Sequence, residues 1–239
     1  MKWWRHRLGK FLLRHGRRPS IAMRPWTQRH LTWVKQAVHF EEPAQEATLL
    51  DYLHEVDHMA GRIERLECAI DDAVSTAPPH MRAVIEALQA LRGVALVSAV
   101  TIVAEVGELS GFARAPQLMG YSGIGASEDS SGTRTRRGGI TKTGNAHVRR
   151  IVIEAAWAYR HRPGVGGALR KRQATLSEEV KGIAWKTQHR LHARYRKLLG
   201  RGKSPQHVVP AVGRELLGFI WAIGIKVETE QRTVPSIAA

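Results

Sequence analysis

Apolar residues recur along this chain at helical spacing, and the pattern predicts a mainly α-helical protein. Its most regular part is a heptad-like stripe between residues 43 and 74, which predicts one long helix. Such a stripe packs either inside one domain, which is the default, or against a second copy of the chain. Because this helix is rich in acidic residues, we expect a structural or dimerising role, with a homo-oligomer formed through residues 45–75. The stripe consists of Leu49, Leu53, Val56, Ala60, Ile63, Ile70 and Val74, with Glu67 in one slot.

Proline and glycine divide the C-terminal part into further predicted helices. Pro79 suits the first turn of a helix that runs to about Leu91, and Gly93 suits its end. The helix–glycine–helix spacing there fits either a hairpin that grips a backbone phosphate or a plain packing hairpin. The apolar stretch 94–106 predicts a buried helix that ends at Gly107. Further helices are expected over residues 115–120, 145–161 and 169–199, and most of 111–145 is expected to be loop.

The first 40 residues carry ten Lys or Arg residues, no Asp or Glu, and several interleaved tryptophans. Short helices are expected around residues 3–15 and 27–38, because prolines interrupt the segment. The composition favours nucleic-acid binding, with bases stacked on aromatic rings and phosphates held by arginines. The alternative is a basic surface with half-buried tryptophan anchors, and individual tryptophans are expected in the core.

These changes in charge and pattern predict four blocks. They are a basic aromatic helical arm (1–40), an acidic long helix (41–76), a C-terminal helical domain (77–228) and a flexible tail (229–239). The formal charge of +16 favours a polyanionic partner. No apolar run reaches the ~18 residues of a spanning helix, so we expect nucleic acid and no membrane as the partner. The single Cys68 fits a reducing cytoplasm, and the scattered histidines form no metal-ligand pattern.

The segment 130–145, SSGTRTRRGGITKTGN, has a composition that suits a phosphodiester. Glycine lets a backbone come close, arginine neutralises phosphate oxygens, and a serine hydroxyl either donates a hydrogen bond or attacks phosphorus. Composition alone favours phosphate binding over attack, and His147 is the nearest candidate general base. The candidate nucleic-acid contacts are Arg134, Arg136, Arg137, Lys142, Asn145, Arg149 and Arg150.

Residues in this region also resemble a known family over about 91–199. The resemblance is to bacterial insertion-sequence transposases of the IS110/IS116/IS902 type, which are bridge-RNA-guided recombinases. The residues that carry it are Leu91–Gly93, Gly107 with Phe112, Gly123–Ile124, Ser130–Gly132, Gly138–Lys142, Gly144–Asn145, Arg149–Arg150 and Glu154–Trp157.

The resemblance implies DNA transposition in the bacterial cytoplasm, in association with the nucleoid. It assigns the nucleophile role to Ser131, with Ser130 as the fallback, and implies DNA and a guide RNA as partners. It also implies an acidic, ribonuclease-H-like domain whose carboxylates hold Mg²⁺, and no segment of this chain matches that domain. We therefore expect a truncated, late-started or decayed copy, with no cofactor of its own. The alternative is a helical nucleic-acid-binding remnant without catalysis.

Overall fold

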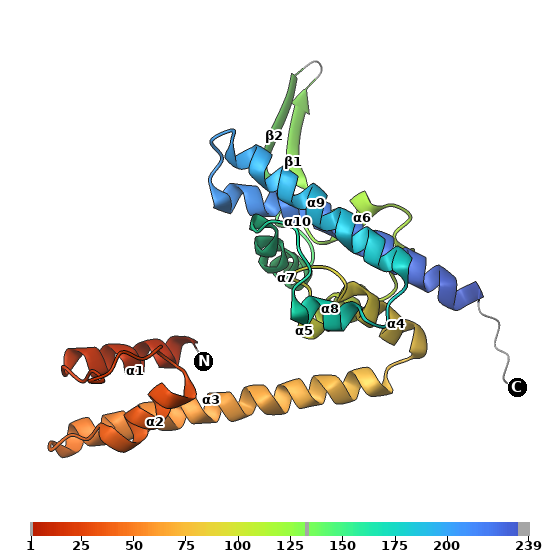
Figure 1. Cartoon of the computed structure of the whole chain (residues 1–239). Coiled ribbons are helices and arrows are strands. Elements are labelled where there is room, and N and C mark those ends of the chain that lie inside the picture. The colour runs from red at the N-terminus through yellow and green to blue at the C-terminus, as the bar shows by residue number, and fades with distance from the viewer. Residues whose placement is uncertain (1, 132–133, 234–239) are drawn as a thin grey trace, which may run out of the picture. The chain divides into compact units, whose positions relative to one another are not determined.

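The computed structural model describes residues 2–131 and 134–233, with side chains described outside 128–137. The prediction of a mainly helical protein is confirmed, since the described chain is built from helices and one two-stranded sheet (Figure 1). The chain forms two compact units, residues 1–71 and residues 72–239. The border between the units falls inside the long helix α3 (Pro43–Thr76).

The first unit consists of α1 (Lys2–Arg14), α2 (Gln28–Ala37) and the N-terminal part of α3. Three tryptophans are half-buried and pack against its apolar cluster, as the alternative of half-buried anchors describes, and do not lie in the core itself. Trp3 is an exception: its side chain is 53% exposed, and the Arg7 guanidinium lies 3.6 Å from its ring centroid. The cluster consists of Leu8, Phe11, Leu12, Val34, Val38, Phe40, Leu49, Leu53 and Val56, with Trp4, Trp26, Leu31, Trp33 and Tyr52 packed against it.

Helix α3 confirms the predicted long helix, but the heptad stripe is not covered along its whole length. Leu49, Leu53 and Val56 are buried in the core of the first unit. Ala60 is exposed, and Ile63 is only half-buried. The first part of the stripe therefore serves packing inside one chain, as the default interpretation held.

The second unit is organised around α10 (Pro205–Thr233), which packs against helices from the beginning, the middle and the end of the unit. Eight of its aliphatic residues between Val208 and Val227 are buried, and α9 runs beside it (Figure 1). Around it lie α4 (Pro79–Leu88), α5 (Leu96–Val106), η1 (Leu109–Gly111), α6 (Ala115–Tyr121), β1 (Ala126–Ser131), β2 (Arg134–Ile140), α7 (Ala146–Ala156), η2 (Trp157–Arg160), α8 (Gly167–Gln173) and α9 (Glu178–Leu199).

Helix α10 is long and apolar enough to cross a membrane by length and composition alone. Half of its most apolar window is buried inside the protein, as is typical of the central helix of a helical core. The helix also extends to Thr233, into the segment predicted as a flexible tail.

Two further differences from the predicted elements have local causes. The predicted helix 169–199 is two helices, because the Ser177 hydroxyl accepts a hydrogen bond from Val180 N and starts α9 anew. Much of the expected loop is the hairpin β1–β2, whose residues are too polar to show the alternation that marks a half-buried strand.

Gly93 decides between the two interpretations of the helix–glycine–helix turn. Its φ is +85°, and a Cβ built there would lie 2.4 Å from the carbonyl oxygen of Ala155 on α7. Glycine is therefore required by the close approach of this turn to α7. The structure supports the plain packing hairpin.

Candidate nucleic-acid site at the hairpin

The strands β1 and β2 are antiparallel, and their register places the two candidate serines opposite residues of the arginine-rich strand. Ser131 is paired with Arg134, and Ser130 with Thr135. Asp129 is paired with Arg136 and Glu128 with Arg137, after an irregularity between Ala126 and Glu128. Residues 132 and 133 lie outside the described residues, as do the side chains of Ser130, Ser131, Arg134, Arg136 and Arg137. The backbone register thus brings the predicted nucleophile and a predicted phosphate contact to the same end of one hairpin.

The base of the hairpin is here called its foot and comprises residues 123–125 before β1 and 141–144 after β2. Backbone hydrogen bonds join these two segments. Thr141 N donates to Gly125 O over 2.9 Å, and Lys142 N donates to Gly123 O over 3.0 Å. Gly123 and Gly144 have positive φ values of 65° and 94°. A Cβ on Gly144 would lie 2.2 Å from Tyr121 O, so the two segments approach too closely for any side chain there.

Asn145 connects this foot to the start of α7. Its side-chain oxygen accepts a hydrogen bond from Val148 N over 2.9 Å, which caps the helix. Its side-chain nitrogen donates to the Glu105 carboxylate over 2.7 Å and to the Tyr121 hydroxyl over 3.2 Å. The Asn145 amide is therefore engaged within the protein, while its predicted contact with nucleic acid stays a prediction.

The other residues near the foot that were predicted to contact nucleic acid differ in how exposed their side chains are. Arg149 is half-buried and donates from its guanidinium to Ser122 O over 2.9 Å, so it has a clear structural role. Arg150 and His147 are exposed on the first turns of α7. Lys142 is exposed and has a φ of 60°, a left-handed conformation that favours glycine. Non-glycine residues in this conformation cluster at functional sites.

Sequence reasoning missed Glu105, Tyr121 and Ser122, which hold the foot in place. Glu105 lies on α5 and reaches Asn145 across 40 positions of the chain. No local pattern marks such a partner, because only the tertiary fold brings α5 and α7 together. Among the described residues, no group of three or more His, Cys, Asp or Glu side chains is placed to hold a metal ion. The described residues therefore do not fit the Mg²⁺ site that the resemblance implies for an acidic domain.

Two tyrosines of the second unit, one at this site and one in η2, are expected to respond differently to replacement by phenylalanine. The Tyr121 hydroxyl donates to Glu105 O over 2.6 Å, so Tyr121→Phe should destabilise the second unit by about 1 kcal/mol. The Tyr159 hydroxyl is buried without a hydrogen-bond partner among the described residues, and burial raises the pKa of Tyr159. Tyr159→Phe should therefore leave the melting temperature unchanged or raise it. Thermal unfolding of both variants tests the pair, and a lower melting temperature for Tyr159→Phe would contradict it.

Comparison with known proteins connects this part of the chain to mobile elements. Residues 85–167 match the sequence model of the Transposase IS116/IS110/IS902 family, a segment that holds α5, α6, the hairpin and α7. The chain is 43% identical over 221 residues to y4qE of Sinorhizobium fredii, a relative named as a transposase; the match covers 92% of this chain and 52% of that protein.

Two further relatives are named as transposases of particular insertion sequences. The chain is 26% identical over 202 residues to the transposase for insertion sequence element IS1533 of Leptospira borgpetersenii, covering 83% of this chain and 57% of that protein. It is 31% identical over 94 residues to the transposase for IS1111A of Coxiella burnetii, covering 37% and 26%. The chain spans about half the length of the first two relatives.

Proposed function

Over residues 85–167 this chain belongs to the Transposase IS116/IS110/IS902 family, and from this premise we propose that it cuts and rejoins DNA through Ser131. The family implies DNA transposition, with DNA as the partner. The observation that carries the serine assignment is the hairpin register, which pairs Ser131 with Arg134 beside the arginine-rich strand. Ser130, one position earlier, is the fallback nucleophile.

The proposed chemistry is an exchange of phosphate esters. The Ser131 Oγ attacks a DNA phosphorus, a bond from phosphorus to one sugar oxygen breaks, and the released strand end takes the proton as a hydroxyl. A hydroxyl of the joining strand then attacks the serine–phosphate ester, and the serine recovers its proton. The number of phosphate ester bonds is unchanged, so neither an oxidant nor a nucleotide is consumed.

Positive charge around the hairpin would support both steps. Serine is a weak nucleophile at neutral pH, and cations close to the phosphate stabilise the charge that develops during transfer. The arginines of β2 are the proposed cations beside Ser131. Lys142 and His147, the proposed general base, lie at the foot of the hairpin and at the start of α7, at the other end from Ser131.

The proposal includes partners that the whole transposase would supply. These are an acidic domain that binds Mg²⁺, a guide RNA, and a second copy of the chain joined through residues 45–75. The chemistry that Mg²⁺ supplies when bound is stabilisation of phosphate charge. The proposed place of action is the bacterial cytoplasm, at the nucleoid.

A second candidate function is a nucleic-acid-binding module without catalysis. It is favoured by the strong positive charge of the chain. This module would show steeply salt-dependent binding to DNA and no strand cleavage.

A covalent-adduct assay separates the two candidates. The chain is supplied with the acidic domain of a full-length relative and with guide RNA, and is incubated with divalent metal and labelled DNA from both sides of its own gene. The products are then denatured and separated by electrophoresis. Catalysis through Ser131 predicts a protein–DNA adduct that is lost in Ser131→Ala and kept in Ser130→Ala. An adduct that persists in Ser131→Ala but disappears in Ser130→Ala would move the role to the fallback. Binding without any adduct from the unaltered chain would favour the module.

A further inference from the structure

An open groove of about 940 Å³ lies between the foot of the hairpin and the turn from α9 to α10. Its lining comes from four separate parts of the chain: the start of β1 with Ile124, the end of β2 with Lys142, the C-terminal half of α9 with the following turn, and the first turns of α10.

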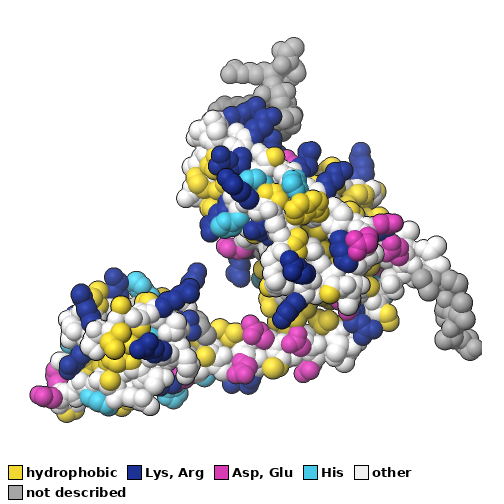
Figure 2. Space-filling view, in the orientation of Figure 1, with side chains coloured by type: hydrophobic (Ala, Val, Ile, Leu, Met, Phe, Trp, Pro, Cys, Tyr) yellow, Lys and Arg dark blue, Asp and Glu magenta, His cyan; other side chains and the backbone are white. Residues whose placement is uncertain are grey.

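All charged residues in the described lining of this groove are positive. Its described lining holds Lys142, Arg194, Lys203 and Arg214 and no Asp or Glu residue. Lys and Arg side chains lie over the α9–α10 end of the second unit, next to the foot of the hairpin, as Figure 2 shows. A cleft lined by charges of one sign concentrates the field and attracts a polymer of the opposite charge. The groove therefore fits a polyanion.

One cation is held in place within the wall. The Glu215 carboxylate lies 3.2 Å from Arg194 Nε and 3.0 Å from Arg190 Nε, so two arginines share a single acid. The trio keeps a net positive charge, and the ion pair restricts the Arg194 side chain. A guanidinium restricted in this way loses less entropy when it binds a phosphate.

The apolar part of the lining also suits a nucleic-acid strand, which has apolar as well as charged surface. Ile124, Leu198, Pro210 and Ala211 provide apolar contact surface, while the cations come from separate elements around them. We propose that this groove binds the phosphodiester backbone of one nucleic-acid strand and guides it to the hairpin that carries Ser131. The proposal rests on the proposed function for the nature of the partner, because the groove adjoins the foot of the hairpin whose other end carries Ser131.

The test measures how tightly the full chain binds a labelled single strand of about 16 nucleotides. Fluorescence anisotropy reports the affinity at each salt concentration of a series. The groove variant is Lys142→Gly with Lys203→Ala, and the matched control is Arg170→Ala with Lys171→Ala. The control removes two exposed cations from α8, outside the groove. Each lost phosphate contact should lower the slope of log affinity against log salt by about 0.7. For the groove variant, the slope of log affinity against log salt should therefore be about 1.4 smaller in magnitude, and the affinity at 0.1 M salt should fall by on the order of tenfold. The control should keep the slope and the affinity of the unaltered chain.

Glycine is chosen at position 142 so that weaker binding by the variant cannot be explained by misfolding. Lys142 has a φ of 60°, which glycine adopts without strain, so Lys142→Gly is expected to keep or raise the melting temperature. Weaker binding by a chain at least as stable would then come from the lost charge.

DNA and RNA strands of the same sequence form the two arms of the experiment. Tighter binding of DNA identifies a substrate strand, and tighter binding of RNA identifies a guide strand. Equal weakening in the α8 control would overturn the proposal, as would displacement by polyglutamate at the same concentration of charge. The assay involves no cleavage, so its failure leaves the Ser131 chemistry untouched, and a missing serine–DNA adduct leaves the groove untouched.

Discussion

Gly123→Ala is expected to lower the melting temperature of the second unit by about 10 °C and to free the hairpin from its foot. Gly123 has a φ of 65°, and a Cβ built there would lie 1.8 Å from the carbonyl oxygen of Thr143. That oxygen belongs to the backbone and cannot move without breaking the neighbouring hydrogen bonds. The left-handed conformation costs alanine about 1–2 kcal/mol, and the clash brings the total to about 3–5 kcal/mol.

Gly125→Ala is the control for this prediction. Gly125 lies two positions further along the same segment, and a Cβ built there would meet no atom within 4 Å. The control should therefore leave the melting temperature nearly unchanged. Hydrogen exchange of the amides of residues 123–142 would show whether the damage in Gly123→Ala is local. A Gly123→Ala chain as stable as the Gly125→Ala chain would contradict the close approach at this foot.

Helix positions were predictable where apolar periodicity and helix-ending residues agree. Helix α3 follows its stripe, and α4 begins at Pro79, as expected from proline at a first turn. The hairpin was not predicted, because backbone pairing holds polar strands such as Arg134–Ile140 without leaving a hydrophobic pattern. The long α10 was also missed: its apolar positions face neighbours on several sides, so no single polar face marks it.

The candidate site was predictable as a segment but not as an arrangement. The glycines, arginines and serines of 130–145 are close in sequence, so composition could mark them. The groove required residues from α9 and α10, although the acid-free basic run between residues 180 and 214 was a signal for them. The partners of Asn145 on α5 and α6 left no such signal, because carboxylates and tyrosines are common on helix surfaces.

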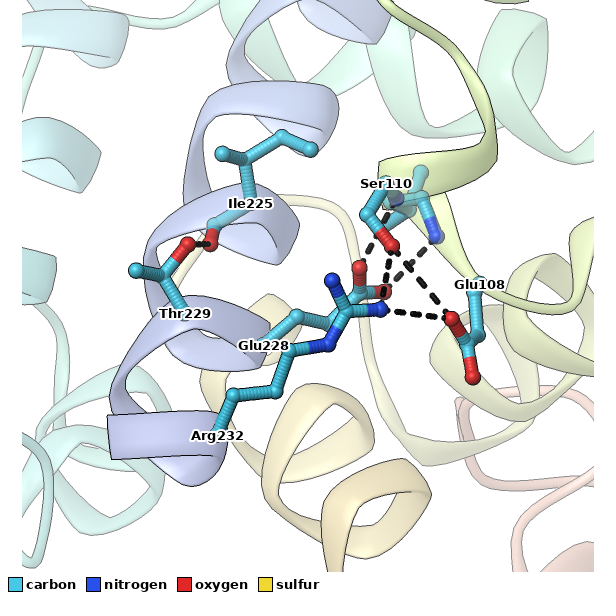
Figure 3. Close-up of polar contacts among 7 residues, drawn as sticks. Glu108, Ser110, Ile225, Glu228, Thr229 and Arg232 are labelled. Carbon is cyan, nitrogen blue, oxygen red and sulfur yellow. Dashed lines mark hydrogen bonds and ion pairs between the residues drawn. The ribbon is translucent and has the colours of Figure 1, made fainter. Parts of the chain in front are cut away.

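Glu228→Ala is expected to be the most damaging single substitution near the end of α10. The Glu228 side chain is buried, with 5% of the residue exposed, and its two oxygens accept hydrogen bonds from Leu109 N over 2.7 Å and Ser110 N over 2.8 Å (Figure 3). These amides begin η1 and have no partner within that short helix. Alanine would leave both amides unpaired in a largely buried place, at a cost of about 3–5 kcal/mol.

Glu228→Gln distinguishes hydrogen bonding from simple burial. Glutamine keeps one acceptor oxygen but loses the charge, so its cost should be about half that of alanine. Glu230→Ala is the matched control, because Glu230 is an exposed acid on the same helix that pairs with Lys226 over 2.8 Å. Exposed pairs of this kind contribute little to stability. In urea unfolding, Glu228→Ala should therefore be the least stable variant, Glu228→Gln intermediate and Glu230→Ala the most stable. Equal stability of the two alanine variants would show that Glu228 does not fasten α10 to η1.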